Sequence, residues 1–90
     1  MKTLHIIVKG IVQGVCFRAF TYRVAKQFFI KGRVKNLING DVEIYAQAEQ
    51  EYLDPFIEKI KLGPPAARVD DIQIEEVIAP IKYETFEITY

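Results

Sequence analysis

The sequence predicts an α+β sandwich: an antiparallel sheet with two helices on one face and an extra C-terminal strand. Three observations lead to this class. Two segments with helical spacing of apolar residues alternate with strand-like segments in the order β-α-β-β-α-β, and one more strand-like segment follows. The segment 41–48 alternates between apolar and polar residues, which is typical of a sheet with one covered face. The Asn-Gly dipeptide at 39–40 indicates a hairpin.

Length and composition limit the classes of function. Ninety residues, half of them hydrophobic, suit a single domain over 1–90. Twelve basic and twelve acidic residues cancel, which argues against a nucleic-acid or membrane-surface partner. One cysteine excludes an internal disulfide and suits a reducing compartment. No apolar run has the character of a signal peptide or membrane span, so we expect a soluble, cytoplasmic protein.

The first strand and the first helix follow from their apolar periodicity. The strand is expected over about Lys2–Lys9, and one of its faces carries Leu4, Ile6 and Val8. The helix is expected to start at Phe17 or Arg18 and to reach about Ile30. Its buried stripe would consist of Phe17, Phe20, Val24 and Phe28. Gly32, just past this segment, is interpreted as the helix stop.

The second and third strands are expected over about Arg33–Ile38 and Asp41–Ala48. The Asn39-Gly40 dipeptide between them predicts a type I′ turn, with positive φ at both central residues. In the third strand the residues expected to face away from the core are Asp41, Glu43, Tyr45 and Gln47. In the second strand Val34 and Asn36 share a face, so Asn36 faces the core if Val34 does.

The second helix is indicated by apolar residues at helical spacing, namely Leu53, Phe56, Ile57 and Ile60. Pro55 fits best in its first turn, with Asp54 as a possible cap, and Gly63 ends it. Two strands then follow, over about Val69–Ile78 and Tyr83–Tyr90. The residues sharing one face of the last strand are Phe86, Ile88 and Tyr90.

The segment Gly10–Arg18 is the strongest candidate for a functional site. It joins the first strand to the first helix, and its glycines let the backbone curl its N–H groups around one point. The first turn of a helix adds N–H groups without intrahelical partners, which favours a bound anion. Arg18 stays charged and can hold two phosphate oxygens at once. The predicted topology also brings Asn36 toward this loop, so we expect a small concave site for a dianionic group.

Two blocks of the sequence resemble the signatures of the acylphosphatase family. The first is Gly10-x-Val12-Gln13-Gly14-Val15-x-Phe17-Arg18, and the second is Gly32-x-Val34-x-Asn36-x-x-Asn39-Gly40-x-Val42-Glu43. A third stretch, Gly63-Pro64-Pro65 followed by Arg68-Val69, is similar to the family's connection from second helix to fourth strand. The resemblance covers essentially the whole chain. It implies a ferredoxin-like fold, and it would start the second helix a few residues earlier.

The resemblance also implies a reaction, the hydrolysis of acyl phosphates to carboxylate and phosphate. Phosphate-binding roles fall on the loop, namely on Gln13, Gly14, Val15, Cys16, Phe17 and Arg18. Arg18 would offset charge in the transition state, and Asn36 would orient the attacking water. Because the leaving carboxylate is weakly basic, positioning and electrostatics can suffice. No metal and no cofactor are expected, and the partner would be a small-molecule acyl phosphate bound by a monomer.

Several alternatives stand beside this interpretation. Cys16 could be a reactive thiol, but a packed or half-exposed thiol is favoured, because a cysteine phosphatase places its arginine further along the loop. The chain could instead be a non-catalytic module that binds acyl or carbamoyl phosphate, as in hydrogenase-maturation carbamoyltransferases, or a plain interaction domain. Ile11 and Arg33 depart from the family pattern, which bears on efficiency and substrate range rather than on the reaction.

Overall fold

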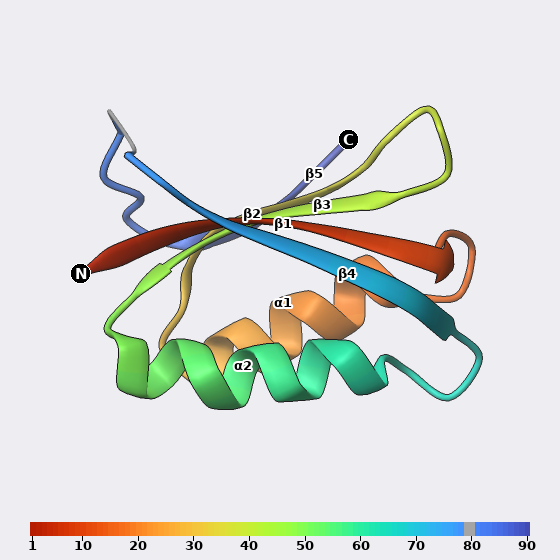
Figure 1. The fold of residues 1–90 in the computed structure, drawn as a ribbon, viewed down its shortest axis with the longest axis horizontal. Coiled ribbons are helices and arrows are strands. Elements are labelled where there is room, and N and C mark those ends of the chain that lie inside the picture. The colour runs from red at the N-terminus through yellow and green to blue at the C-terminus, as the bar shows by residue number, and fades with distance from the viewer. Residues whose placement is uncertain (79–80) are drawn as a thin grey trace.

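Five strands and two helices make up the described chain, which in the computed structural model comprises residues 1–78 and 81–90. They are β1 (Lys2–Ile11), α1 (Phe17–Gln27), β2 (Lys31–Asn36), β3 (Val42–Ala48), α2 (Gln50–Leu62), β4 (Arg68–Val77) and β5 (Phe86–Thr89). The strands form one sheet in the order β4-β1-β3-β2-β5. Both helices lie on the same face of this sheet (Figure 1). The predicted α+β sandwich with an extra strand is confirmed.

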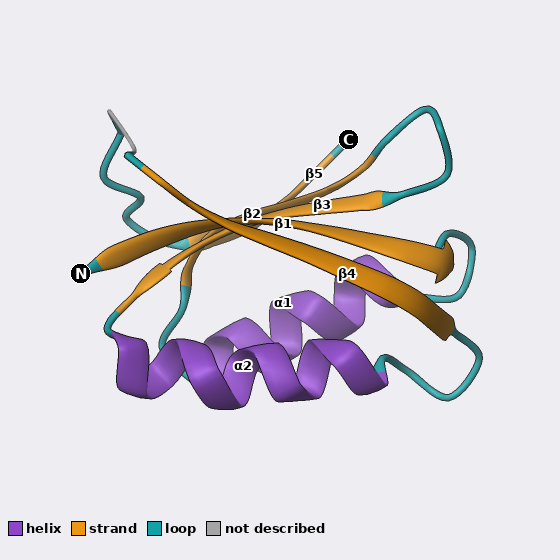
Figure 2. Cartoon of the chain, viewed as in Figure 1, coloured by secondary structure: helices purple, strands orange, loops and turns teal. Residues whose placement is uncertain are grey.

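The strand pairs are antiparallel except at the last strand. Figure 2 shows β5 beside β2, and these two strands pair in parallel, so the sheet is mixed. Since β5 runs parallel to β2, the C-terminal ends of both strands lie at the same end of the sheet, next to Asn36. None of the described helices has the length and apolarity to span a membrane.

β1 lies between β3 and β4 and pairs antiparallel with both. Its predicted inner face is confirmed, because Leu4, Ile6 and Val8 are all buried. The strand runs two residues past the predicted end, since a register shift after Lys9 keeps it paired with β4. At Gly10 a Cβ would stand 2.0 Å from the carbonyl oxygen of Arg68, so only glycine permits this approach.

The core lies between the sheet and the two helices. Its largest fully buried side chains come from helices and strands alike: Phe17, Phe56, Phe86, Ile6, Ile44, Leu53 and Ile60. Of the stripe predicted for α1, Phe17 and Val24 are buried, whereas Phe20 and Phe28 are only partly covered. Thr21 and Ala25 complete the buried face of this helix.

α1 ends at Gln27, three residues before the predicted end. The chain then turns through Phe29, which has a left-handed φ of 58°. The N–H groups of the turn reach carbonyls of the last helical turn, Phe28 to Val24 at 3.1 Å and Ile30 to Ala25 at 2.8 Å. These bonds pair carbonyl groups at the end of the helix. A phenylalanine thus occupies the left-handed position at which glycine is usual.

Gly32 is not the helix stop that the sequence predicts. It is the second residue of β2, where its φ is +143°. A Cβ there would stand 1.8 Å from the carbonyl oxygen of Tyr45 on β3. The glycine is therefore required by the close approach of two strands, a contact that local pattern cannot reveal.

The β2–β3 hairpin also differs from its prediction, because its turn is not of type I′. Gly40 has a φ of +98°, but Asn39 is not in the left-handed region. The N–H of Gly40 donates to the carbonyl of Leu37 at 3.2 Å, and the N–H of Leu37 donates to that of Asp41 at 2.8 Å. The loop therefore has three residues with glycine last. The Asn39 side chain accepts from the N–H of Asp41 at 3.0 Å and favours this longer loop.

α2 starts at Gln50, earlier than its proline suggested, and Pro55 lies in the second turn rather than the first. Asp54 is therefore not the cap. The preceding residue is Glu49, whose carbonyl accepts from the N–H groups of Tyr52 at 3.0 Å and Leu53 at 3.1 Å. Burial of Leu53 favours the extra turn despite the missing N–H of proline. Gly63 ends the helix as predicted, with its N–H on the carbonyl of Lys59 at 3.2 Å.

Gln47 lies on the outer face, as the alternation of β3 predicted, but it is buried there and only 6% exposed. Its amide nitrogen donates to the hydroxyl of Thr3 at 2.9 Å and to the carbonyl of Ile81 at 3.3 Å. Its amide oxygen accepts from the N–H of Tyr83 at 2.9 Å. Residues 81–83 thus cover this end of the outer face, and β5 begins only at Phe86.

Candidate functional site

The segment between β1 and α1 is a curved loop with buried apolar residues at both ends. Val12 and Phe17 are buried, and between them Gly14 has a φ of +75° and Cys16 a φ of 64°. Cys16 is the N-cap of α1, yet no side chain caps the helix and no acidic residue lies in its first turn. The N–H groups of that turn have no intrahelical acceptors, so the loop presents a partial positive charge.

Gln13 fastens this loop to the β2–β3 hairpin. Its amide nitrogen donates to the carbonyl of Leu37 at 2.7 Å and to that of Asp41 at 2.8 Å. The side chain therefore points away from the cavity described below, and Val15 packs against the core. Of the predicted loop residues, these two have side chains outside the cavity lining, and only their backbone N–H groups remain candidates for binding.

Arg18 lies in the first turn of α1, with its side chain held by β5 and the residue that follows it. Nη1 donates to the carbonyl of Thr89 at 3.3 Å, and Cζ lies 4.6 Å from the centroid of the Tyr90 ring. A cation at a helix N-terminus opposes the helix dipole. The N-terminus of α1 and the Arg18 guanidinium are both positive and lie close together, which favours a bound anion between them.

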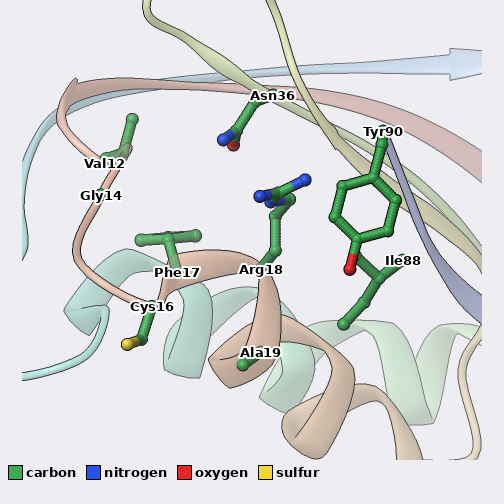
Figure 3. A pocket seen from close by; sticks show the side chains of 9 residues that line it. All are labelled: Val12, Gly14, Cys16, Phe17, Arg18, Ala19, Asn36, Ile88 and Tyr90. Atoms are coloured by element: carbon green, nitrogen blue, oxygen red, sulfur yellow. The ribbon is translucent and has the colours of Figure 1, made fainter.

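Asn36 is the last residue of β2 and shares the helix-covered face with Val34, as the alternation predicted. Its Oδ1 is buried and has no hydrogen-bond partner among the described residues. A buried acceptor left unpaired costs about 1–3 kcal/mol. Figure 3 shows this amide pointing toward the guanidinium of Arg18. A polar group that binds between the two side chains would satisfy it.

A cavity of about 200 Å³ joins these groups. The residues that line it are Val12, Gly14, Cys16, Phe17, Arg18, Ala19, Asn36, Ile88 and Tyr90 (Figure 3). The structure thus brings together two segments that the sequence placed near each other only by topology. Among residues 1–78 and 81–90, no group of three or more His, Cys, Asp or Glu side chains is arranged to hold a metal ion.

Sequence reasoning missed the contribution of β5 to this cavity. Ile88 and Tyr90 line it, and the Thr89 carbonyl binds Arg18. The alternation of the last strand did place Phe86, Ile88 and Tyr90 on one face, but nothing in it indicated which strand β5 would join. The thiol of Cys16 is exposed at the rim of the cavity.

Comparison with known proteins gives a consistent result over the whole chain. The family model described as acylphosphatase matches residues 4–88. An acylphosphatase of Thermotoga petrophila is 48% identical over 90 residues, covering 100% of this chain and 99% of the relative. The crystal structure of acylphosphatase from Bacillus subtilis superimposes with a TM-score of 0.96 at 39% identity, and all of both chains is covered.

A further similarity concerns a larger protein. The crystal structure of full-length HypF in the phosphate- and nucleotide-bound form matches with a TM-score of 0.91 at 34% identity. The match covers 99% of this chain but 12% of that one. The alternative of a non-catalytic module is not favoured, because acylphosphatases match this chain over essentially their full length.

Proposed function

The chain belongs to the acylphosphatase family and is an acylphosphatase, and on this basis we propose how its residues cleave the carboxyl–phosphate bond. The backbone N–H groups of residues 13–18 and the guanidinium of Arg18 bind the phosphate. Asn36 orients a water for attack on phosphorus. The bond between phosphorus and the acyl oxygen breaks, and its electron pair leaves with the carboxylate.

The observation that carries this proposal is the buried, unpartnered Oδ1 of Asn36 in the same cavity as Arg18. A water held by this oxygen would satisfy the orphaned acceptor and would face a phosphate bound to the guanidinium. The side-chain N–H₂ of the same amide can hold the water's lone pair or a phosphate oxygen.

The reaction makes modest demands on the protein. The carboxylate is a weakly basic leaving group, so no strong general acid is required, and the proton of the water can pass to a phosphate oxygen. Phosphoryl transfer through a loose transition state is accelerated mainly by positioning and by charge stabilisation. Arg18, the loop N–H groups and Asn36 supply both, and we propose a mechanism that needs neither a metal nor a cofactor.

We further propose that one domain over residues 1–90 acts as a cytoplasmic monomer without a nucleic-acid partner. The balanced charge of twelve basic and twelve acidic residues offers no electrostatic attraction to a polyanion. A single cysteine suits a reducing compartment. Arg18, Asn36 and the loop meet in one cavity of a single chain, and this supports the proposal of a monomer.

Alanine substitution at the two proposed catalytic residues tests these roles. Arg18→Ala and Asn36→Ala should each lower kcat/KM for benzoyl phosphate by about 10²–10⁴-fold, since each removes a group that acts on the transition state. Circular dichroism and urea unfolding would verify the fold.

Matched controls are available for both substitutions. Arg23→Ala removes an exposed arginine from the same helix, and Gln27→Ala removes an exposed side-chain amide at its far end. Neither residue lines the cavity, so both variants should hydrolyse benzoyl phosphate at rates within about twofold of wild type. Turnover within threefold of wild type in folded Arg18→Ala or Asn36→Ala would refute the assigned role.

A further inference from the structure

We propose that the apolar side of the cavity, formed by Ala19, Ile88 and Tyr90, binds the acyl group and makes this enzyme favour aromatic acyl phosphates. The inference rests on the proposed function, because it takes the phosphate to be held by Arg18. It concerns a part of the site that the phosphate-binding residues do not explain, the side turned toward β5 (Figure 3).

The cavity is larger than the reacting groups require. Its volume of about 200 Å³ is far above the roughly 10–15 Å³ that a cavity needs to hold one water. A phosphate and one attacking water therefore leave room for the first atoms of an acyl group. The lining residues that neither of them uses are Ala19, Ile88 and Tyr90.

The Tyr90 ring is an exposed surface that is nevertheless held in place. It is 90% exposed, so it contributes little to the core. One of its faces meets the guanidinium of Arg18, with 4.6 Å from Cζ to the ring centroid. The preceding residue, Thr89, accepts a hydrogen bond from the same guanidinium at 3.3 Å. A ring held on one face, with its other face and its edge free, can contact a second aromatic ring.

The acyl group of a bound substrate comes within reach of this ring. Phosphate oxygens lie about 2.8 Å from the guanidinium nitrogens that hold them. The acyl carbon is joined to phosphorus through one oxygen atom, so its substituent extends by a few more ångströms, comparable with the spacing of Arg18 and Tyr90. In Figure 3, Asn36 and Tyr90 lie on different sides of the guanidinium, which separates the attacking water from the acyl group.

The chemistry of this side favours apolar acyl groups. Arg18 is the single charged residue that lines the cavity in the described part of the chain, and its charge serves the phosphate. The side chains of Ile88 and Ala19 offer only carbon to a ligand here. An aromatic acyl group can bury its ring on Tyr90 and Ile88, whereas an acetyl group is too small to gain much from either.

The test compares two substrates in each variant. We would measure kcat/KM for benzoyl phosphate and for acetyl phosphate with wild type, Tyr90→Ala and Tyr90→Phe. The quantity compared is kcat/KM for benzoyl phosphate divided by kcat/KM for acetyl phosphate. This ratio removes any effect on Arg18, because both substrates carry the same phosphate. Comparing each variant's ratio with that of wild type also removes the intrinsic difference in leaving-group reactivity. The ratio should fall about three- to tenfold in Tyr90→Ala, the size of one aromatic contact, and stay within twofold in Tyr90→Phe.

Tyr22→Ala is the matched control, because Tyr22 also stacks with a cation, Lys26 at 5.3 Å, but lies outside the cavity. Its ratio should equal that of wild type. An unchanged ratio in Tyr90→Ala, with both rates lowered together, would overturn the inference and leave the ring only the task of holding Arg18. Failure of the wild type to hydrolyse either substrate would overturn the proposed function itself, and the inference with it.

Discussion

The two ends of α1 share an unusual backbone feature and use it differently. Cys16 precedes the helix with a φ of 64°, and Phe29 follows it with a φ of 58°. A side chain in this region costs about 1–2 kcal/mol. At Phe29 the neighbouring N–H groups reach carbonyls of the helix, whereas at Cys16 no side chain caps the helix. Left-handed backbone thus indicates a ligand site only where the polar groups beside it lack partners.

The largest expected effect comes from replacing a glycine by alanine on either side of α1. Gly14 lies in the loop before the helix, and Gly32 lies in β2 after it. Gly32→Ala, near the end of α1, should lower the free energy of unfolding by at least about 3 kcal/mol, because the Cβ would stand 1.8 Å from the Tyr45 carbonyl oxygen. Gly14→Ala meets no atom within 4 Å and should cost about 1 kcal/mol through its φ of +75°. Its main effect should be weaker inhibition by inorganic phosphate. Urea unfolding and inhibition assays measure both, and equal losses of stability would contradict the comparison.

A middle-sized effect should appear when an anion binds the uncapped end of α1. Inorganic phosphate at a hundred times its Kd should stabilise the folded chain by about 2.7 kcal/mol. Arg18→Ala should lose this stabilisation, whereas Phe29→Gly, at the other end of α1, should keep it. Thermal unfolding with and without phosphate measures the difference. The same gain in Arg18→Ala would show that phosphate binds elsewhere.

The smallest effect concerns relief of backbone strain at Phe29. Its side chain is 72% exposed and makes an edge contact with Tyr52, the ring centroids lying 5.6 Å apart. Phe29→Gly should stabilise the chain by about 0.5 kcal/mol, since the relieved strain exceeds the lost ring contact. Hydrolysis should not change. Cys16→Gly relieves similar strain but makes the loop before α1 more flexible, so hydrolysis should fall. Urea unfolding measures the stability of both variants, and kcat/KM measures their hydrolysis. Equal activity in Phe29→Gly and Cys16→Gly would contradict the prediction.

Local periodicity predicted most of the fold, because apolar spacing of two and of 3.6 residues reflects which face each element buries. The inner residues Leu4, Ile6 and Val8 of β1 were identified in this way. The proximity of Asn36 to the loop before Arg18 also followed, since strand direction alone brings those two ends to one edge of the sheet. These predictions required no knowledge of individual side-chain contacts.

Three of the errors arose where distant segments meet. Gly32 looked like a helix stop because its real constraint is the Tyr45 carbonyl on the neighbouring strand. Gln47 looked exposed because its partners lie in the connection that precedes β5. Tyr90 was not assigned to the site because nothing local indicates that the last strand pairs with β2. The meeting of the loop, Arg18 and Asn36 at one cavity was therefore predictable, whereas the contribution of Ile88 and Tyr90 to its lining was not.

The hydrogen bond from Arg18 to the Thr89 carbonyl spans 71 positions of sequence. During synthesis the loop and its arginine leave the ribosome long before the strand that holds the guanidinium. A nascent chain that has exposed only its first half therefore lacks both partners of this guanidinium, the Thr89 carbonyl and the Tyr90 ring. Arg18 acquires these contacts only when β5 pairs with β2, so the geometry of the proposed phosphate site depends on the last strand.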